Sequence, residues 1–302
     1  MFWQILYSNL EGVLVVIKSF CIKSNNKEIL NYALCNFKGN SPDNFYLSKN
    51  KFKIYNNIIL HYTGNDINCF YNYISSLIEH IVLKFYEPKL IKNTINFDYF
   101  YFTDFEKEKI YDITQEALLE NTTIVSSRLN VLYHLCHTYV KSNKSMILDG
   151  FINFRLKEYT SILNDIISEA ASNYTIQKEY DEFIEILETY VHSNKPTKKE
   201  VHMIYFNEDS LLLDEHKNII NLDKNISTAK YLSDISFSSN DYCLNALLNI
   251  LPKRIYIHLL NITDNDAFLD TLYAIFGKRI IICLDSELCS FYKTNDIIKK
   301  NN

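Results

Sequence analysis

The stretch FINFRLKEYTSILNDIISEAASNYTIQKEYDEFIEILETYV, Phe151–Val191, decides how the chain is expected to fold. Its apolar residues recur at alternating spacings of four and three, which is typical of the heptad seam of a packed helix. The first part of the seam consists of Ile152, Leu156, Tyr159, Leu163, Ile166 and Ala170, and the second of Ile176, Tyr180, Phe183, Leu187 and Tyr190. The stretch therefore predicts two amphipathic helical segments.

The two parts of the seam are out of step with each other. From Ala170 to Ile176 the seam jumps six residues, and a straight helix cannot absorb this jump without rotating its apolar face. We expect a break or kink over Ser172–Thr175, although neither Gly nor Pro marks it. An αα-hairpin is the first prediction, and a kinked long helix is the second.

Two charged residues lie within these apolar faces. At about 100° per residue, Arg155 falls between Ile162 and Tyr159 on the first helix, and Glu179 falls on the apolar arc of the second. Because an unpaired buried charge is costly, each is expected to have a partner or to reach a cavity. In a hairpin the two would be offset by roughly 18 Å at ~1.5 Å per residue, so they are not expected to pair with each other.

Arg155 has two readings. Its stem could pack on the apolar face while its guanidinium meets a carboxylate or backbone carbonyls. Alternatively, it could belong to a site for a partner or ligand.

The chain before this stretch changes character near residue 65. Residues 1–65 mix short β-like runs with polar turns, and the expected strands are Phe2–Tyr7, Val13–Ile17, Phe52–Tyr55 and Ile58–Tyr62. From Ile67 the apolar spacing becomes helical. Helices are expected from Ile67 to Tyr86, where Glu87 and Pro88 end the first, from about Asp104 to Leu119, and from Thr123 to Lys141.

Beyond the polar linker around Pro196 the period changes to that of strands. Strands are expected at Val201–Phe206, Ser210–Asp214, Arg254–Leu260 and Arg279–Asp285, with helices at Asp241–Leu251 and Asp266–Phe276. The last two strands and the helix between them form a β-α-β unit with parallel strands.

The predicted fold class is therefore α+β, in three parts. Residues 1–65 form a small mixed α+β region, residues 66–195 a helical bundle, and residues 196–302 a small C-terminal α/β domain.

Composition limits the classes of partner. The formal net charge is −5 and lysines are spread along the chain, so no basic face for nucleic acid is expected. The seven cysteines form no CxxC pair, which indicates free thiols in a reducing compartment. The apolar run Gly12–Ile17 is far shorter than the ~20 residues of a spanning helix and lacks the features of a signal peptide. We expect a cytoplasmic protein without an integral membrane segment; peripheral attachment stays open.

No catalytic constellation is recognisable. The chain has neither a GxSxG elbow nor a glycine-rich phosphate loop, and no cofactor is expected. On the helix of residues 123–141, Cys136 points to the core whereas His134 and His137 point away, so no metal site is predicted. His258 alternates to the sheet face opposite Ile255 and Ile257 and is expected to be a hydrogen-bonded structural histidine, with catalysis as the alternative.

Asp285 follows the last predicted strand. Ligands of α/β sheets bind at the carboxyl ends of parallel strands, so Asp285 could act as an acid or metal ligand. The alternative is that it caps the short helix that follows.

Two blocks of the helical stretch carry a family resemblance. The block FINFRLKEY, Phe151–Tyr159, and the block KEYDEFIEIL, Lys178–Leu187, followed by the LLLDE turn at Leu211–Glu215, closely resemble the YtxC-like family of endospore-forming Firmicutes. The resemblance is strong from about residue 120 to 260 and weak before residue 65. It implies a sporulation protein in the cytoplasm of a spore-forming bacterium. It implies no established biochemical activity, and therefore no catalytic residue.

Two functions remain open at this point. The favoured one is a non-enzymatic interaction or regulatory protein with an unknown protein partner, docked around Arg155 and Glu179. The alternative is an enzyme or small-ligand-binding protein with a pocket between the helical and C-terminal domains. The binding or buried-charge candidates are Arg155, Glu179, Tyr159, His258 and Asp285.

Overall fold

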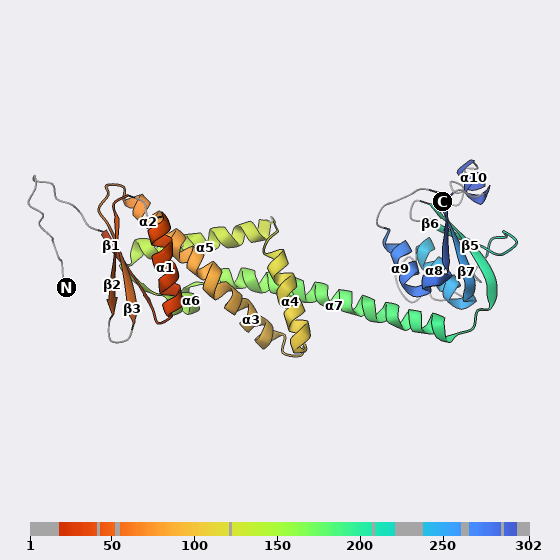
Figure 1. Ribbon diagram of the computed structural model, residues 1–302, viewed down its shortest axis with the longest axis horizontal. Coiled ribbons are helices and arrows are strands. Elements are labelled where there is room, and N and C mark those ends of the chain that lie inside the picture. The colour runs from red at the N-terminus through yellow and green to blue at the C-terminus, as the bar shows by residue number, and fades with distance from the viewer. Residues whose placement is uncertain are drawn as a thin grey trace, which may run out of the picture. The chain divides into compact units, whose positions relative to one another are not determined.

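The computed structural model describes residues 18–40, 43–51, 55–120, 123–206, 209–220, 238–260, 266–284 and 287–294. The chain divides into two compact units between Thr175 and Ile176, and each is described by itself. The α+β class with a helical central region is confirmed (Figure 1). The expected strands Phe2–Tyr7 and Val13–Ile17 lie outside the described residues, as do residues 52–54 of the expected strand Phe52–Tyr55. The division into three domains stays a prediction.

The first unit contains a four-stranded sheet in the order β2-β3-β1-β4. Its strands are β1 (Lys18–Ser24), β2 (Phe45–Lys51), β3 (Asn56–Tyr62) and β4 (Ser145–Ile147), and helix α1 (Lys27–Asn40) follows β1. β3 pairs antiparallel with both β1 and β2, whereas β4 pairs parallel with β1. Of these elements the sequence predicted β3, whereas β1, β2, β4 and α1 are findings of the structure.

The helices of the first unit follow the predicted order with one correction. They are α2 (Ile67–Ile81), the π-helical turn η1 (Val82–Tyr86), α3 (Glu87–Asp98), α4 (Asp104–Ala117), α5 (Thr123–Ser142) and α6 (Leu148–Arg155). The prediction that Glu87 and Pro88 end a helix is wrong, because both lie in the first turn of α3. Proline is tolerated there because the first N–H groups of a helix have no intrahelical partner.

Helix α4 begins where the sequence predicted. Its N-cap is Thr103, whose hydroxyl accepts a hydrogen bond from the Glu106 backbone N–H, while the Glu106 carboxylate accepts one from the Thr103 N–H at 2.7 Å. This reciprocal capping box satisfies N–H groups at the start of the helix.

Helix α7 (Lys157–Ser193) is one continuous helix of 37 residues. The predicted αα-hairpin and the break over Ser172–Thr175 are therefore wrong. The chain leaves helical geometry instead at Leu156, with φ −94° and ψ 23°, between α6 and α7. The break was expected because both parts of the seam were assumed to pack on the same partner, whereas the division between the units falls at Thr175.

The core of the first unit joins its sheet to its helices. One hydrophobic cluster includes Ile22 and Leu60 from the sheet, Ile78 from α2, Cys136 from α5 and Leu163 from α7. All six residues of the first seam are buried, as their spacing predicted. The first half of α7 is therefore a core helix.

The second unit is a four-stranded sheet in the order β6-β5-β7-β8. Its strands are β5 (Lys198–Phe206), β6 (Asp209–Leu213), β7 (Pro252–Leu259) and β8 (Ile280–Cys283). β5, β7 and β8 are parallel, which confirms the β-α-β unit, and β6 is antiparallel to β5.

Two helices cover one face of this sheet. α8 (Ser239–Ile250) and α9 (Ala267–Phe276) share a core with inward-facing strand residues such as Met203 and Ile257 (Figure 1). A short helix, α10 (Glu287–Thr294), follows β8. Gly277 ends α9 with a positive φ of 49°, a conformation that suits a glycine C-cap.

Candidate functional site

The second half of α7 carries an exposed apolar surface. Four residues, here called the α7 stripe, are largely uncovered: Ile176 at 62%, Phe183 at 52%, Ile186 at 66% and Tyr190 at 45% exposed. At about 100° per residue they fall within one arc of the helix. Three of these residues, Ile176, Phe183 and Tyr190, belong to the second part of the seam, which was predicted to be a packed face, so their exposure is a correction.

The neighbouring arc of the same helix packs on its own unit. Val191 is buried in the core of the C-terminal sheet, with Ile184 and Leu187 packed against it. Tyr180 forms a hydrogen bond of 2.7 Å between its hydroxyl and that of Thr271 on α9. The second unit thus covers only part of the apolar arc on the second half of α7. The α7 stripe is the part of that arc that stays uncovered.

Negative charge predominates on this part of α7. Residues 176–191 contain Glu179, Asp181, Glu182, Glu185 and Glu188 against a single lysine, Lys178. Lys178 lies 3.7 Å from the Glu182 carboxylate in an exposed i,i+4 pair. All five acids are exposed. At about 100° per residue, Glu179 lies within the stripe and Glu182 at its edge, so the surface combines apolar contact area with these two carboxylates.

Arg155 and Glu179 are both exposed, so their predicted burial is wrong. Arg155 is the last residue of α6, and the break at Leu156 means that it does not share a continuous helical face with Tyr159. Glu179 does lie on the arc of the α7 stripe, but that arc is uncovered. Their roles in binding stay predictions.

A buried arginine does exist in the first unit. Arg128 on α5 is 6% exposed, and its Nη1 donates to the Glu87 carboxylate at the start of α3. The hydroxyl of Tyr159, which is fully buried on α7, donates to the same carboxylate oxygen. Burial, and then the charge of Glu87, raise the pKa of Tyr159 above its usual range.

This polar cluster of Glu87, Arg128 and Tyr159 ties three helices together. Sequence reasoning placed Tyr159 on the seam but missed its two partners. The signal was available, because Arg128 stands three residues after Val125 and four before Leu132, on the apolar stripe of its own helix. Buried and paired, these groups hold the core rather than offer a reactive site.

The second unit contains a chain of titratable side chains on the sheet face opposite α8 and α9. Lys217 Nζ lies 2.5 Å from His202 Nε2, His202 Nδ1 lies 2.9 Å from His258 Nε2, and His258 Nδ1 lies 3.6 Å from Cys289 Sγ. His202 is on β5, His258 on β7 and Cys289 in the first turn of α10. Residues far apart in sequence thus form one connected group, here called the His–Cys chain.

The direction of these hydrogen bonds follows from Lys217. An ammonium only donates, so His202 Nε2 accepts, and the proton of the neutral ring sits on Nδ1. His202 Nδ1 then donates to His258 Nε2, which leaves the His258 proton on Nδ1, facing Cys289. Burial, followed by the charges of His202 and Lys217, lowers the pKa of His258 to about 4. The His202 pKa is also lowered by burial, so both rings are neutral near pH 7.

The predicted position of His258 agrees with the structure. Its side chain is buried on the face opposite Ile255 and Ile257, which pack in the core shared with α8 and α9. The sequence analysis did not place His202, Lys217 or Cys289 beside His258, because these three residues come from other segments of the chain. Asp285 lies outside the described residues, and its role stays a prediction.

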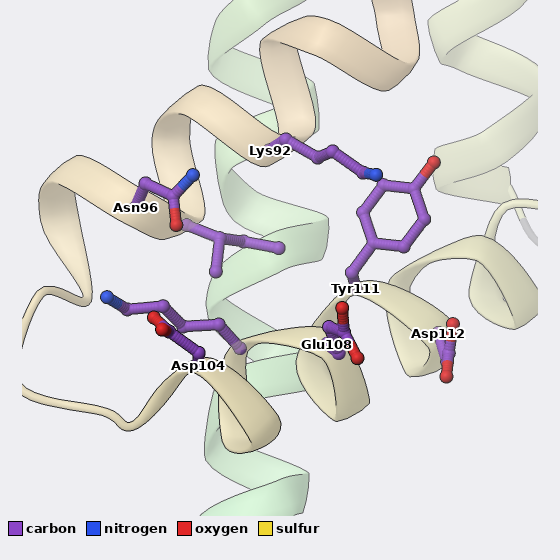
Figure 2. A pocket seen from close by; sticks show the side chains of 8 residues that line it. Lys92, Asn96, Asp104, Glu108, Tyr111 and Asp112 are labelled. Carbon is purple, nitrogen blue, oxygen red and sulfur yellow. The ribbon is translucent and has the colours of Figure 1, made fainter.

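A surface pocket of about 520 Å³ lies between α3 and α4. Figure 2 shows the side chains that line it, among them Lys92 and Asn96 from α3 and Asp104, Glu108 and Tyr111 from α4. Lys92 Nζ lies 4.8 Å from the centre of the Tyr111 ring. The volume suits a small molecule, but charges of both signs favour no single class of ligand. The predicted pocket between the helical and C-terminal domains stays a prediction.

A group of exposed aromatic residues lies at the turn that joins the same two helices. Phe97, Phe100, Tyr101 and Phe105 are each about two-thirds exposed or more. The turn gives a second apolar surface, in the first unit, with which the α7 stripe can be compared by experiment.

Two further results concern the part of the chain that the structure describes. It contains no group of three His, Cys, Asp or Glu residues arranged to hold a metal ion. It also contains no helix long and apolar enough to cross a membrane.

Comparison with known proteins identifies the family. The model of the YtxC-like family matches residues 72–281, a range that includes all of α7. The chain belongs to the YtxC-like family. A curated relative, the "Uncharacterized protein YtxC" of Bacillus subtilis strain 168, is 26% identical over 134 residues. The aligned part is 43% of this chain and 46% of the relative, so the match spans about half the length of that YtxC protein. No solved structure matches the chain.

Proposed function

We propose that this member of the YtxC-like family is a non-enzymatic interaction protein that acts during sporulation in the cytoplasm of a spore-forming bacterium. The observation that carries the interaction role is the α7 stripe, an exposed apolar surface within the range that the family model matches. The setting comes from the family resemblance of the FINFRLKEY and KEYDEFIEIL blocks.

The partner we propose is a basic amphipathic helix of another protein. From Ile176 to Tyr190 the stripe is roughly 21 Å long at ~1.5 Å per residue, which matches about four turns of a partner helix. Glu179 within the stripe and Glu182 at its edge favour lysine and arginine at the facing positions of that helix. A second copy of the same helix would instead bring carboxylates against carboxylates, and the phosphates of nucleic acid would be repelled in the same way.

Glu179 has a defined part in this proposal. It lies among the residues of the stripe, so a basic side chain of the partner would pair with it where water is largely excluded. Such a pair contributes specificity by disfavouring partners without a matching cation. Arg155 belongs to the other unit, and its part in binding stays a prediction.

Site-specific photo-crosslinking in sporulating cells tests the surface directly. A photoreactive amino acid at Phe183 should give one defined product, whereas the same group at Glu185, on the opposite side of the helix, should not. Tyr101, an exposed aromatic of the first unit, is the control for non-specific adhesion. Mass spectrometry should place the Phe183 crosslink in a basic amphipathic helix. A product formed with a second copy of this chain, or equal products from all three positions, contradicts the proposal.

Substitution then tests whether the surface matters. Phe183→Ser with Ile186→Ser should lower sporulation yield and leave the melting temperature unchanged, because both side chains are exposed. Loss of two contacts worth about 2 kcal/mol together would weaken binding of the crosslinked partner by about 30-fold. Glu185→Ser is the matched control. Normal sporulation of the double variant at normal protein abundance would overturn the proposal.

A further inference from the structure

The His–Cys chain ends beside a second thiol. Cys283 is the last residue of β8 and is paired in register with His258 on β7, so the two side chains share one face of the sheet. Cys289 Sγ lies 3.4 Å from the backbone oxygen of Cys283 and 3.6 Å from His258 Nδ1. Two cysteines and a histidine thus meet at the carboxyl end of the parallel strands.

We propose that Cys283 and Cys289 form a reversible disulfide, and that Cys283 is the entry point for low-molecular-weight disulfides. The proposal does not depend on the α7 stripe. It assigns the C-terminal sheet a redox-sensitive modification site.

Exposure decides the order in which the two thiols react. Cys283 is partly exposed, whereas Cys289 is 1% exposed and packed in a small cluster with Ile204 and Leu213. A reagent in solution therefore meets Cys283 first. Cys289 reacts only from within the protein, as the resolving thiol.

Electrostatics favours the second step. The His258 Nδ1–H faces the Cys289 sulfur, and the positive charge of Lys217 stands at the far end of the same hydrogen-bonded chain. The His258 N–H is thus placed to donate a hydrogen bond to the Cys289 sulfur while that sulfur attacks Cys283. Burial, and then the neighbouring Cys289, raise the pKa of Cys283, while Lys217 partly opposes them. Entry at Cys283 should therefore be slow near pH 7 and faster as pH rises, because the thiolate is the attacking species.

The reaction balances with the disulfide reagent as oxidant. The Cys283 thiolate attacks one sulfur of the reagent, forms a mixed disulfide and releases one thiolate, which takes up a proton. The Cys289 sulfur then attacks Cys283 Sγ, breaks the mixed disulfide, and its proton goes to the second thiolate that departs. Two protein thiols are oxidised to one disulfide, and the reagent is reduced to two thiols.

The test uses the full-length protein and oxidised glutathione, followed by blocking of the remaining thiols and peptide mass spectrometry. The native chain should yield a Cys283–Cys289 disulfide with no glutathione retained at either residue. Cys289→Ser should hold glutathione on Cys283, and Cys283→Ser should protect Cys289 from the reagent. Dithiothreitol should reverse both modifications. Glutathione uptake at exposed Cys35 is the internal control and should be the same in all proteins.

The variant His258→Gln tests whether the histidine assists the attack of Cys289 on Cys283, or whether the closeness of the two thiols is sufficient. This variant should accumulate the Cys283 mixed disulfide by slowing its resolution about tenfold, equivalent to about 1.4 kcal/mol, with the entry rate unchanged. If the variant unfolds, the two cysteine variants still decide the matter. The proposal is overturned if the native chain retains glutathione on Cys283 as long as Cys289→Ser does, or if Cys283 is not modified at all.

Discussion

The two halves of α7 have the same sequence pattern and opposite surroundings. In residues 157–175 the apolar seam is buried in the core of the first unit, and Leu163 and Tyr159 are almost fully covered. In residues 176–193 a seam of the same spacing leaves Ile176, Phe183 and Tyr190 exposed, together with the neighbouring Ile186. Spacing therefore shows that a helix has an apolar face, whereas the nature of what covers that face comes from the rest of the chain or from another molecule.

The largest expected effect concerns the continuity of the helix itself. Spin labels at the exposed positions Ser161 and Glu185, attached through non-canonical amino acids so that the native cysteines remain, are 24 residues apart. A continuous helix separates them by ~36 Å at ~1.5 Å per residue. A hairpin turning near Asn173 would bring them to about 10 Å, the spacing of packed helices. Pulsed electron paramagnetic resonance distinguishes the two, and the short distance would remove the basis of the comparison.

The packing of the two halves of α7 can be compared by truncating one apolar side chain in each half. Leu163→Ala should lower the free energy of unfolding by about 2 to 5 kcal/mol, because it empties a buried site. Ile186→Ala should change it by less than about 0.5 kcal/mol, since the side chain is mostly in water. Urea denaturation measures both. Equal losses would mean that the second half is covered after all.

One tyrosine from each half of the seam, Tyr159 and Tyr190, gives a comparison of side chains of nearly equal volume. Tyr159→Phe removes a donor from the buried Glu87 carboxylate and should cost about 1.5 to 3 kcal/mol, the range for hydrogen bonds to charged groups. Tyr190→Phe should be neutral within about 0.5 kcal/mol. Thermal melts of the two variants should therefore differ clearly, and a neutral Tyr159→Phe would show that the hydroxyl does not stabilise the core.

Acid and alkali should destabilise the two units separately, because acid acts on the second unit through His258 and alkali on the first through Tyr159. The folded pKa of His258, about 4, is below its ordinary value near 6.5, so the unfolded chain binds more protons between these values. The stability that the second unit gains from a neutral His258 is present above pH 6.5 and lost as pH falls towards 4, by on the order of 3 kcal/mol. Hydrogen exchange of β7 amides should speed up over this window in the native chain and less in His258→Gln.

The first unit should respond at the opposite end of the pH scale. The pKa of Tyr159 is raised, so its contribution is present below pH 10 and is lost as pH rises above that value. Exchange of α5 amides should therefore increase in alkali before that of β7 changes. If the α5 amides instead exchange faster in acid together with the β7 amides, the two units do not unfold separately.

Prediction from sequence succeeded where segments were apolar and regularly spaced. The strands and helices of the C-terminal sheet were all found, because runs such as RIYIHLL are bounded by clear turns. The first seam was correct at every position. Local patterns of this kind need no knowledge of the remainder of the chain.

Prediction failed where the signal was weak or lay between distant segments. β2 is an edge strand, and only Phe45 of its seven residues is buried among those whose side chains are described, so its sequence is largely polar. The pairing of Arg128 with Glu87, and the assembly of Lys217, His202, His258 and Cys289, join residues that are 15 to 56 positions apart. No periodicity encodes such contacts. Arg155 was misplaced because the break at Leu156 left no mark in the spacing.

The π-helical turn η1 has a consequence for how relatives of this chain should be aligned. A π-turn wraps one residue more than an α-turn, so Val82–Tyr86 holds an extra residue directly before Glu87. Deleting one residue there would restore a regular helix and leave α3 facing the same way, because the wide turn takes up the extra residue. Converting the turn to regular α-helix without a deletion would instead rotate α3 by about 100° and turn the Glu87 carboxylate away from Arg128 and Tyr159. A relative that lacks this residue should therefore keep the buried Glu87–Arg128 pair, so a one-residue gap in an alignment of the family belongs inside η1.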